Sequence, residues 1–382
     1  MQRETLCGMI VGVSLNIGKL ENTTGEWMKN RSWKKGVLLA AASIAAAGVM
    51  GCQGGEAGRK LEAYDKQYLT YFDTITSVTI YAENEEQFQA YEQIVSRELE
   101  RYHQLFDIYE NYEGINNIKS INDSAGVKPV QVDEDIIDLL GFSLEQYEKT
   151  DGKLDVAMGS VLSVWHDYRE QASEHPEQAV IPDQSELLQA AEHMDIENMV
   201  IDKEASAVYL KDPEMRLDVG AVAKGYAAQE LAETLKEEGV EHALLSLGGN
   251  VVTIGTKGDG KPWRVGVQNP DLSSSEPYLH VVDLEDMSLV TSGTYQRFYE
   301  VDGKRYHHII NPDTLMPWDA YQAVTILTPD SALADALSTA VFNMELDDGM
   351  ELIESLENTE ALWVLPDGRE VESSGFGAFI EE

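Results

Sequence analysis

Five strand-like segments follow one another after residue 243 with no helix between them. They cover residues 243–247, 251–256, 263–268, 279–284 and 288–291. Parallel strands need long crossover connections, so strands joined this closely must pair in antiparallel fashion. Two hairpin turns, at Asp302-Gly303 and Asp367-Gly368, continue the pattern. This run predicts an antiparallel C-terminal half and excludes a repeated strand–helix–strand fold.

The part of the chain before residue 243 is patterned mainly as helices. Apolar residues recur at helical spacing over 84–106 and over 133–149, where Asp133 is placed to cap the helix. Further helices are predicted over 185–193, over 219–238, and from a cap at Ser331. The fold class is therefore α+β, with antiparallel sheets and packed helices in one domain over 68–382. We expect a ligand cleft between a helical N-terminal half and a C-terminal sheet half.

Two short motifs carry the chemistry. Residues 217–225 read Leu-Asp-Val-Gly-Ala-Val-Ala-Lys-Gly, which places an acid, a glycine turn and Lys224 at a predicted helix start. A helix start offers free N–H groups and a positive dipole end to a phosphate. More than a hundred residues later, Asp335 and Thr339 lie at i and i+4 on one helix face. A carboxylate and a hydroxyl are oxygen ligands that suit Mg²⁺. Together the motifs indicate a pyrophosphate held by a turn, a lysine and a metal.

These motifs resemble those of a known family, the ApbE-type flavin transferases (FAD:protein FMN transferases). Residues 218–226 resemble the family's D-x-G-[GA]-I-A-K-G-Y, and residues 335–339 its D-A-[LW]-S-T. Four further matches follow the family order: 152–159 with Trp165, 246–250, 291–297, and 308–314 with Pro317. The resemblance covers roughly residues 68 to 380, and six motifs in order make chance agreement improbable. It implies a T-fold-like domain.

The resemblance also implies a role for particular residues. Asp335 and Thr339 would bind Mg²⁺ together with the backbone carbonyl of Ala221, and Lys224 would lie against the FAD phosphates. Asp218 would contact FAD and stands with His308 as a catalytic candidate, His308 as a base. The remaining FAD-binding positions are Phe72, Tyr109, Asp155, Val156, Ala157 and Ile309. Seen singly, an i,i+4 polar pair or a strand histidine is more often structural than catalytic.

Three positions depart from the family pattern. Asn311 replaces the usual aspartate, Leu315-Met316 replaces Gly-Arg, and Ala157 stands where threonine is common. These changes affect the loop after His308 and the supporting hydrogen bonds, but leave the expected metal ligands intact.

The N-terminus has the pattern of a lipoprotein signal. Residues 28–51 combine a basic segment with a short apolar stretch, too short to span a bilayer comfortably, and end before Cys52 in Val-Met-Gly-Cys. Cys52 is the predicted lipidation site, and residues 52–67 a flexible tether. Residues 1–27 are predicted to be a spurious or disordered leader, with Met28 as the true start. The alternatives are an ordinary signal peptide and a genuine longer leader.

Charge limits the class of partner. The chain has 68 acidic against 28 basic residues, a net charge of −40, which repels nucleic acid and anionic lipid head groups. We therefore expect no nucleic-acid binding. The same field repels FAD, so a phosphate site needs local cations such as Mg²⁺ and Lys224.

The resemblance implies the reaction as well. FAD would be split, FMN transferred to a threonine hydroxyl of an acceptor protein with an S-G-A-T-like motif, and AMP released. An FAD pyrophosphatase, in which water attacks instead, and a non-catalytic flavin-binding lipoprotein are the alternatives. The lipid anchor would place the protein on the cell membrane, facing outside the cytoplasm.

Overall fold

The computed structural model describes residues 60–381. The predicted leader (1–27), signal segment (28–51) and Cys52 lie outside them. The helices are α1 (Glu85–Phe106), α2 (Ile118–Asp123), α3 (Glu134–Lys149), α4 (Gly159–Glu174), α5 (Gln184–Ala191), α6 (Ala223–Glu237), α7 (Ser331–Ala340) and α8 (Leu346–Glu354). The strands are β1 (Glu62–Tyr68), β2 (Thr76–Ala82), β3 (Val130–Gln131), β4 (Met199–Asp202), β5 (Ala207–Leu210), β6 (Ala243–Leu247), β7 (Asn250–Ile254), β8 (Trp263–Gln268), β9 (Tyr278–Leu284), β10 (Ser288–Gly293), β11 (Phe298–Val301), β12 (Lys304–His307), β13 (Ala323–Thr328), β14 (Glu360–Val364) and β15 (Glu370–Glu372).

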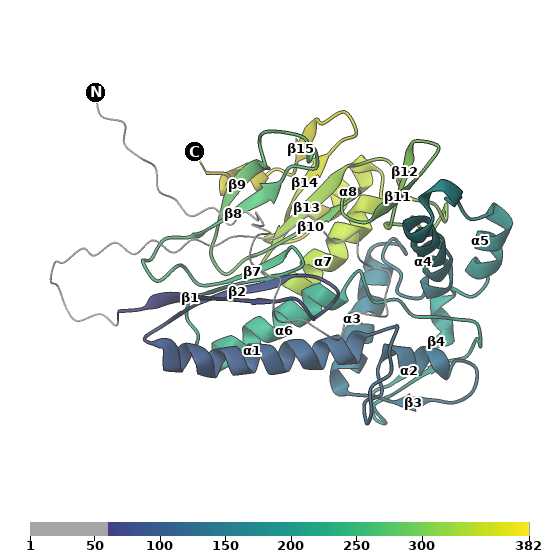
Figure 1. The fold of residues 1–382 in the computed structure, drawn as a ribbon, viewed down its shortest axis with the longest axis horizontal. Coiled ribbons are helices and arrows are strands. Elements are labelled where there is room, and N and C mark those ends of the chain that lie inside the picture. Colours follow the sequence, from purple (N-terminus) through teal and green to yellow (C-terminus); the bar gives the residue numbers. More distant parts are fainter. Residues whose placement is uncertain (1–59, 382) are drawn as a thin grey trace.

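An eight-stranded antiparallel sheet organises the molecule (Figure 1). Its strand order is β1-β2-β6-β7-β10-β13-β14-β15. The predicted α+β class and antiparallel pairing are confirmed. The expected division into an N-terminal helical half and a C-terminal sheet half is too simple, because β1 and β2 pair with β6 and extend the C-terminal sheet.

Both faces of this sheet are covered. Alternate residues of each strand point to opposite faces, so β13 sends Val324 and Ile326 into one core and Leu327 into another. The first core lies under α1, α6 and α7, and the second under the β8–β9 hairpin with Phe376. Burial on both faces explains why the central strands β6, β7 and β13 are rich in apolar residues and do not alternate between apolar and polar ones.

A smaller lobe stands beside this layered body (Figure 1). It contains α2 to α5 and a three-stranded sheet of order β3-β5-β4, and the β11–β12 hairpin packs on α4. Sequence patterning did not predict α4. No side chain caps its N-terminus, where Met158 precedes the first residue, so the usual start signal is missing.

The predicted Asp133 cap of α3 is confirmed, and α1 begins one residue after the predicted start at residue 84, where Asn84 is the cap. Asn84 accepts a hydrogen bond from the Gln87 N–H, and Asp133 accepts one from Asp135. The predicted helices differ from the structure at α6 and α7. Helix α6 begins at Ala223 rather than Val219, because Asp218 folds the preceding residues into a turn. Helix α7 is capped by Asp330, whose carboxylate accepts from Leu333, and not by Ser331.

The domain also begins earlier than expected. Residues 62–67, placed in the flexible tether by the sequence, belong to β1 and pair in register with β2. The strand is mostly exposed on an edge of the sheet, so it lacks the apolar alternation that predicts a strand. Within residues 60–381, no helix combines the length and apolarity needed to cross a bilayer.

Candidate functional site

Asp335 is held in the interface between α6 and α7. Its side chain is buried, and its carboxylate accepts a hydrogen bond of 2.8 Å from the Gly225 N–H. The ammonium group of Lys224 lies 3.5 Å from the same oxygen. Gly225 is needed for this approach, because a Cβ there would lie within 3.0 Å of the Ser331 carbonyl and of the Asp335 Cβ. The two motifs separated by more than a hundred residues therefore meet in space, as predicted.

Burial raises the pKa of Asp335, and Lys224 and the Gly225 N–H act in the opposite direction. Asn250, at the start of β7, also favours the ionised form. Its amide nitrogen nevertheless lies outside hydrogen-bond geometry and is buried without a partner among the described residues. The negative charge of a buried carboxylate that its neighbours offset only in part favours the binding of a further cation.

The expected metal ligands present oxygen atoms only. Thr339 is half-buried one turn after Asp335, and its hydroxyl makes no hydrogen bond within residues 60–381. Ala221 lies in the turn before α6. A carboxylate, a hydroxyl and a carbonyl form the donor set preferred by Mg²⁺ rather than by softer metals. The residues therefore fit the metal that the sequence predicted.

The turn before α6 is more ordered than a simple phosphate loop. The Asp218 carboxylate accepts from the Gly220 N–H at 2.8 Å, and the Val222 and Ala223 N–H groups both donate to the Val219 carbonyl. Among the described residues, the N–H groups of Ala221 and Lys224 have no partner. The anion-binding capacity predicted for the helix start is thus confined to these two donors and the Lys224 side chain.

Asp218 connects this turn to the segment 155–157. Its N–H donates to the Val156 carbonyl at 2.9 Å, and Ala157 donates its N–H to the Asp155 carboxylate at 2.7 Å. Burial raises the pKa of Asp218, whereas the charges of His166, Arg169 and Arg297 favour its ionised form. The predicted residues 155–157 and 218 therefore lie side by side.

Two aromatic residues stand among the predicted FAD-binding positions. Tyr109 is 52% exposed, and its ring lies 5.3 Å from the imidazole of His166. Phe72 is half-buried, contacts His103 edge-on, and has a left-handed backbone with φ of 53°. Such a conformation in a non-glycine residue often marks a functional segment. Both residues offer apolar surface suited to a planar ligand.

His308 lies one residue beyond the end of β12, not on the outgoing strand as predicted. Its Nδ1 lies 3.2 Å from the Arg297 carbonyl oxygen, so the proton belongs on Nδ1 and Nε2 keeps its lone pair. Burial and the charges of Arg297 and Arg169 lower the pKa of His308 well below its usual value. The neighbouring Ile309 is buried, and its N–H faces His307 Nδ1 at 3.3 Å. A flavin contact through that N–H would compete with His307.

This arrangement matches one family in sequence and in structure. The family model described as the ApbE family matches residues 72–363, which is most of the chain. The chain belongs to the ApbE family.

Its ApbE relatives include proteins named FAD:protein FMN transferase. The protein of Treponema pallidum is 34% identical over 272 residues, covering 68% of this chain and 73% of its own. That of Klebsiella pneumoniae is 30% identical and covers 69% of this chain and 81% of its own. This chain is accordingly an enzyme of a flavin transferase family.

Solved ApbE structures share the fold. The crystal structure of the ApbE protein of Thermotoga maritima has a TM-score of 0.73 at 28% identity, covering 84% of this chain and all of that one. The flavin transferase ApbE of Vibrio cholerae has a TM-score of 0.71 at 24% identity, with 84% of this chain covered.

The departures from the ApbE pattern are accommodated locally. Asn311 accepts from the Asp313 and Thr314 N–H groups and donates to the Asn343 carbonyl. Leu315 has a left-handed φ of 59°, which explains why the family prefers glycine there. Its carbonyl accepts from the Trp165 indole at 2.9 Å. The substituted loop is therefore held by its own hydrogen bonds.

Sequence reasoning missed several residues of this ApbE site. Asn250 and Arg297 fall in matched motifs but received no role, although a polar residue after two glycines and an arginine near a histidine are visible signals. His166 and Arg169 lie on α4, which was not predicted at all. They reach the site only because α4 packs between the β11–β12 hairpin and α5.

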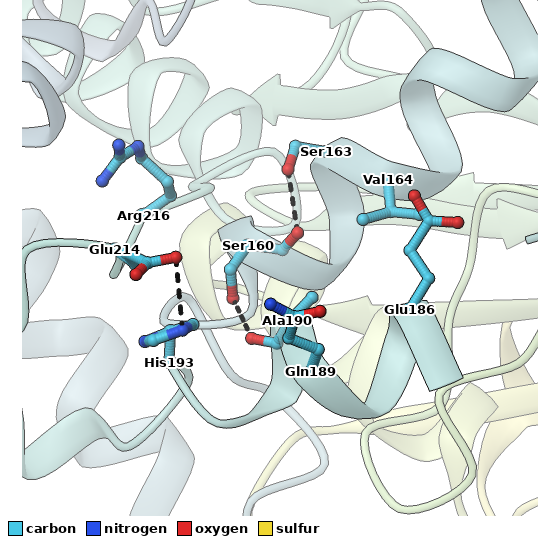
Figure 2. A pocket seen from close by; sticks show the side chains of 9 residues that line it. All are labelled: Ser160, Ser163, Val164, Glu186, Gln189, Ala190, His193, Glu214 and Arg216. Carbon is cyan, nitrogen blue, oxygen red and sulfur yellow. Dashed lines mark hydrogen bonds and ion pairs between the residues drawn. The ribbon is translucent and has the colours of Figure 1, made fainter. Parts of the chain in front are cut away.

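A separate cavity of about 320 Å³ lies between α4 and α5 (Figure 2). His193 lines this cavity. Its Nδ1 lies 2.9 Å from the Asp212 carboxylate and its Nε2 lies 3.5 Å from the Glu214 carboxylate. The cavity contains none of the predicted site residues. Its lining is Ser160, Ser163, Val164, Glu186, Gln189, Ala190, His193, Glu214 and Arg216. His193 is paired and Glu186 accepts from the Tyr168 hydroxyl, so we do not associate the cavity with the ApbE reaction.

Asp155 gives the site a testable pH dependence. Burial raises its pKa to about 7, so the folded state resists ionisation that the unfolded chain undergoes near pH 4. Stability from this residue is therefore present below about pH 4 and lost as the pH rises to about 7. Asp155→Asn keeps an acceptor for Ala157 and should melt a few degrees higher than wild type at pH 8. At pH 4 the two proteins should melt together, as followed by calorimetry. A constant difference at both pH values would contradict this.

Proposed function

We propose that this enzyme cleaves FAD and transfers FMN to a threonine hydroxyl of an acceptor protein, releasing AMP, in a Mg²⁺-dependent reaction. One observation carries the proposal: Asp335 is buried against the first turn of α6, 3.5 Å from Lys224 and one turn from the Thr339 hydroxyl. Such a cluster is suited to a pyrophosphate bound with a divalent cation. The ApbE relatives named above act on the same substrate class by their names.

The metal would be held by Asp335, Thr339 and the Ala221 carbonyl. When bound, Mg²⁺ neutralises the pyrophosphate and the charge that develops on the departing AMP. The protein supplies the remaining interactions. Lys224 contributes a fixed positive charge, and the Ala221 and Lys224 N–H groups can donate to phosphate oxygens.

Proton removal is assigned to His308. The threonine Oγ bonds to the flavin-side phosphorus, and the bond from that phosphorus to the bridging oxygen breaks to release AMP. The hydroxyl proton passes to His308 Nε2, which is free because Nδ1 faces the Arg297 carbonyl. The low pKa keeps the imidazole neutral before substrate binds. A bound phosphate then stabilises the imidazolium.

Asp218 is the second candidate for the base, since burial raises its pKa and it faces the same charges. His308→Asn and Asp218→Asn separate the two candidates. Loss of the true base should remove the acidic limb of the pH dependence of kcat, where the base becomes protonated, whereas loss of a positioning group should lower kcat and keep its pH profile.

The reaction is tested by incubating the protein with FAD, Mg²⁺ and a flavin-acceptor domain. Covalent FMN on the acceptor, measured by mass, together with an equal amount of AMP, supports the transferase. AMP with free FMN would identify the pyrophosphatase alternative. No AMP under any condition would leave a flavin-binding protein and refute the enzymatic proposal.

We further propose that Cys52 carries the lipid that anchors the protein to the cell membrane, outside the cytoplasm. The support is the Val-Met-Gly-Cys sequence after a basic and then apolar segment. More than one acyl chain is needed for stable anchoring, and lipoprotein processing supplies that. Cys52→Ala should move the protein from the membrane to the soluble fraction without changing catalysis. An unmodified Cys52 in the mature wild type, found by mass analysis, would contradict the proposal.

A further inference from the structure

Two arginines near Asp218 lack the ion pairs that other arginines of this chain make. Arg169 lies on α4, and Arg297 lies just before β11. Within residues 60–381, neither guanidinium lies within ion-pair distance of a carboxylate, and the same holds for Arg216. The other described arginines, Arg97, Arg101, Arg264, Arg305 and Arg369, each make an ion pair. The chain has 68 acidic residues, so carboxylates are abundant. A shortage of them does not explain why these two arginines lack a carboxylate partner.

The charge of Arg297 also acts on Arg169. Burial and the charge of Arg297 lower the pKa of Arg169. Both charges act on Asp218, on Tyr109 and on His308, so the two groups belong to one cluster. Two like charges near each other are unfavourable, and the single charge of Asp218 offsets only part of this, so the cluster favours binding of a further anion.

His166 fixes one member of this pair. Its Nδ1 accepts from the Arg169 guanidinium at 3.0 Å and faces the Tyr109 hydroxyl at 3.3 Å. Burial and Arg169 lower the pKa of His166, which keeps the imidazole neutral and able to accept. This hydrogen bond therefore holds the Arg169 side chain in one orientation.

The pair is distinct from the lysine at the phosphate turn. The Gly220 N–H donates to the Asp218 carboxylate, and the Gly220 carbonyl lies 3.4 Å from Lys224 Nζ. Lys224 and Asp335 thus belong to the α6 end of this turn, and the arginines to the Asp218 end.

We propose that Arg169 and Arg297, with His166 as a positioning residue, form a second anion-binding subsite that receives an oxyanion of a bound substrate. The proposal rests on the proposed function for what those substrates are. A phosphate oxygen of FAD and a carboxylate of the acceptor protein have the same chemistry here, and binding measurements separate the two sources.

The FAD arm compares the full chain with Arg169→Gln, Arg297→Gln and the double variant, with Mg²⁺ present. Arg305→Gln is the matched control, an exposed arginine of the adjacent hairpin that pairs with Glu300 at 3.2 Å. If FAD supplies the anion, its Kd rises at least about tenfold in the double variant while the Kd for riboflavin stays unchanged.

The acceptor arm measures binding of two peptides that carry Ser-Gly-Ala-Thr, one flanked by aspartates and one by asparagines, with EDTA to prevent turnover. If the acceptor supplies the anion, wild type prefers the aspartate peptide about tenfold or more, and the double variant binds both alike. Both arms measure binding, so absence of FMN transfer by wild type would refute the proposed function without deciding this test.

The subsite is overturned if the double variant keeps FAD affinity and peptide preference within twofold of the Arg305→Gln control. It is also overturned if the affinity for riboflavin falls as much as the affinity for FAD, since the arginines would then have a structural role. His166→Leu should reproduce part of the arginine effect, and His166→Asn, which retains an acceptor, should restore it. Equal losses in these two variants would refute the positioning role.

Discussion

Asp335→Asn should lower FMN transfer and AMP release by about 100-fold or more. Asparagine keeps the size of the side chain but removes the negative charge that faces Lys224 and the expected Mg²⁺. Mutating groups that merely support a metal ligand already costs about 10- to 100-fold, so loss of the charged ligand should cost at least as much. The same change neutralises a buried carboxylate, so the melting temperature should stay the same or rise.

A Mg²⁺ titration checks the assignment. Wild type treated with EDTA should lose activity and regain it with added Mg²⁺, whereas Asp335→Asn should need a much higher Mg²⁺ concentration. Thr339→Ser and Thr339→Val form a matched pair, because serine keeps the hydroxyl and valine keeps the shape. Serine should remain close to wild type in Mg²⁺ requirement. Near-wild-type activity of Asp335→Asn at limiting Mg²⁺ would sink the metal assignment.

Gly225→Ala should be the most damaging single-methyl substitution in the site. The added Cβ would meet the Ser331 carbonyl and the Asp335 Cβ within 3.0 Å, and neither group can move without separating α6 from α7. Overpacking of this kind costs about 1–3 kcal/mol and sometimes more. The hydrogen bond from the Gly225 N–H to Asp335 would lengthen at the same time, so activity should fall together with stability.

Gly141→Ala is the control for that substitution. Gly141 lies inside α3, and a Cβ there would meet only the Lys203 ammonium at 3.8 Å. Alanine should stabilise this helix by roughly 0.5–1 kcal/mol. Denaturant unfolding of both variants measures the contrast. Equal stability of Gly225→Ala and wild type would mean that the helices adjust at little cost, and that close contact does not hold Asp335 in place.

The elements that sequence predicted best are those with local signals. Helices α1 and α3 have apolar periodicity and side-chain caps at Asn84 and Asp133, and these signals act within a few residues. The start of α6 was predicted four residues early, because Asp218 turns its carboxylate back onto Gly220. That hydrogen bond depends on where the chain goes next, which a helical pattern does not encode.

The candidate site divides in the same way. Asp335, Lys224 and Asp218 were predicted because they stand in recognisable motifs. His166 and Arg169 were not, because their role depends on α4 being placed beside Tyr109 by tertiary packing. The contribution of β1 was missed for a similar reason, since an exposed edge strand is stabilised by its backbone pairing with β2 rather than by its own apolar residues.

Because β1 begins early in the chain, it limits how far the folded domain can lie from a membrane anchor at Cys52. Only residues 53–61 separate Cys52 from Glu62, the first residue of the strand, and the ten steps between these two residues span roughly 35 Å at most. With Cys52 acylated as proposed, the β1 edge of the sheet could not lie farther from the bilayer surface than the full length of this segment. Acceptor threonines would then be selected by height above the membrane as well as by sequence. Lengthening the segment with Gly-Ser repeats would widen the layer in which acceptors can be modified.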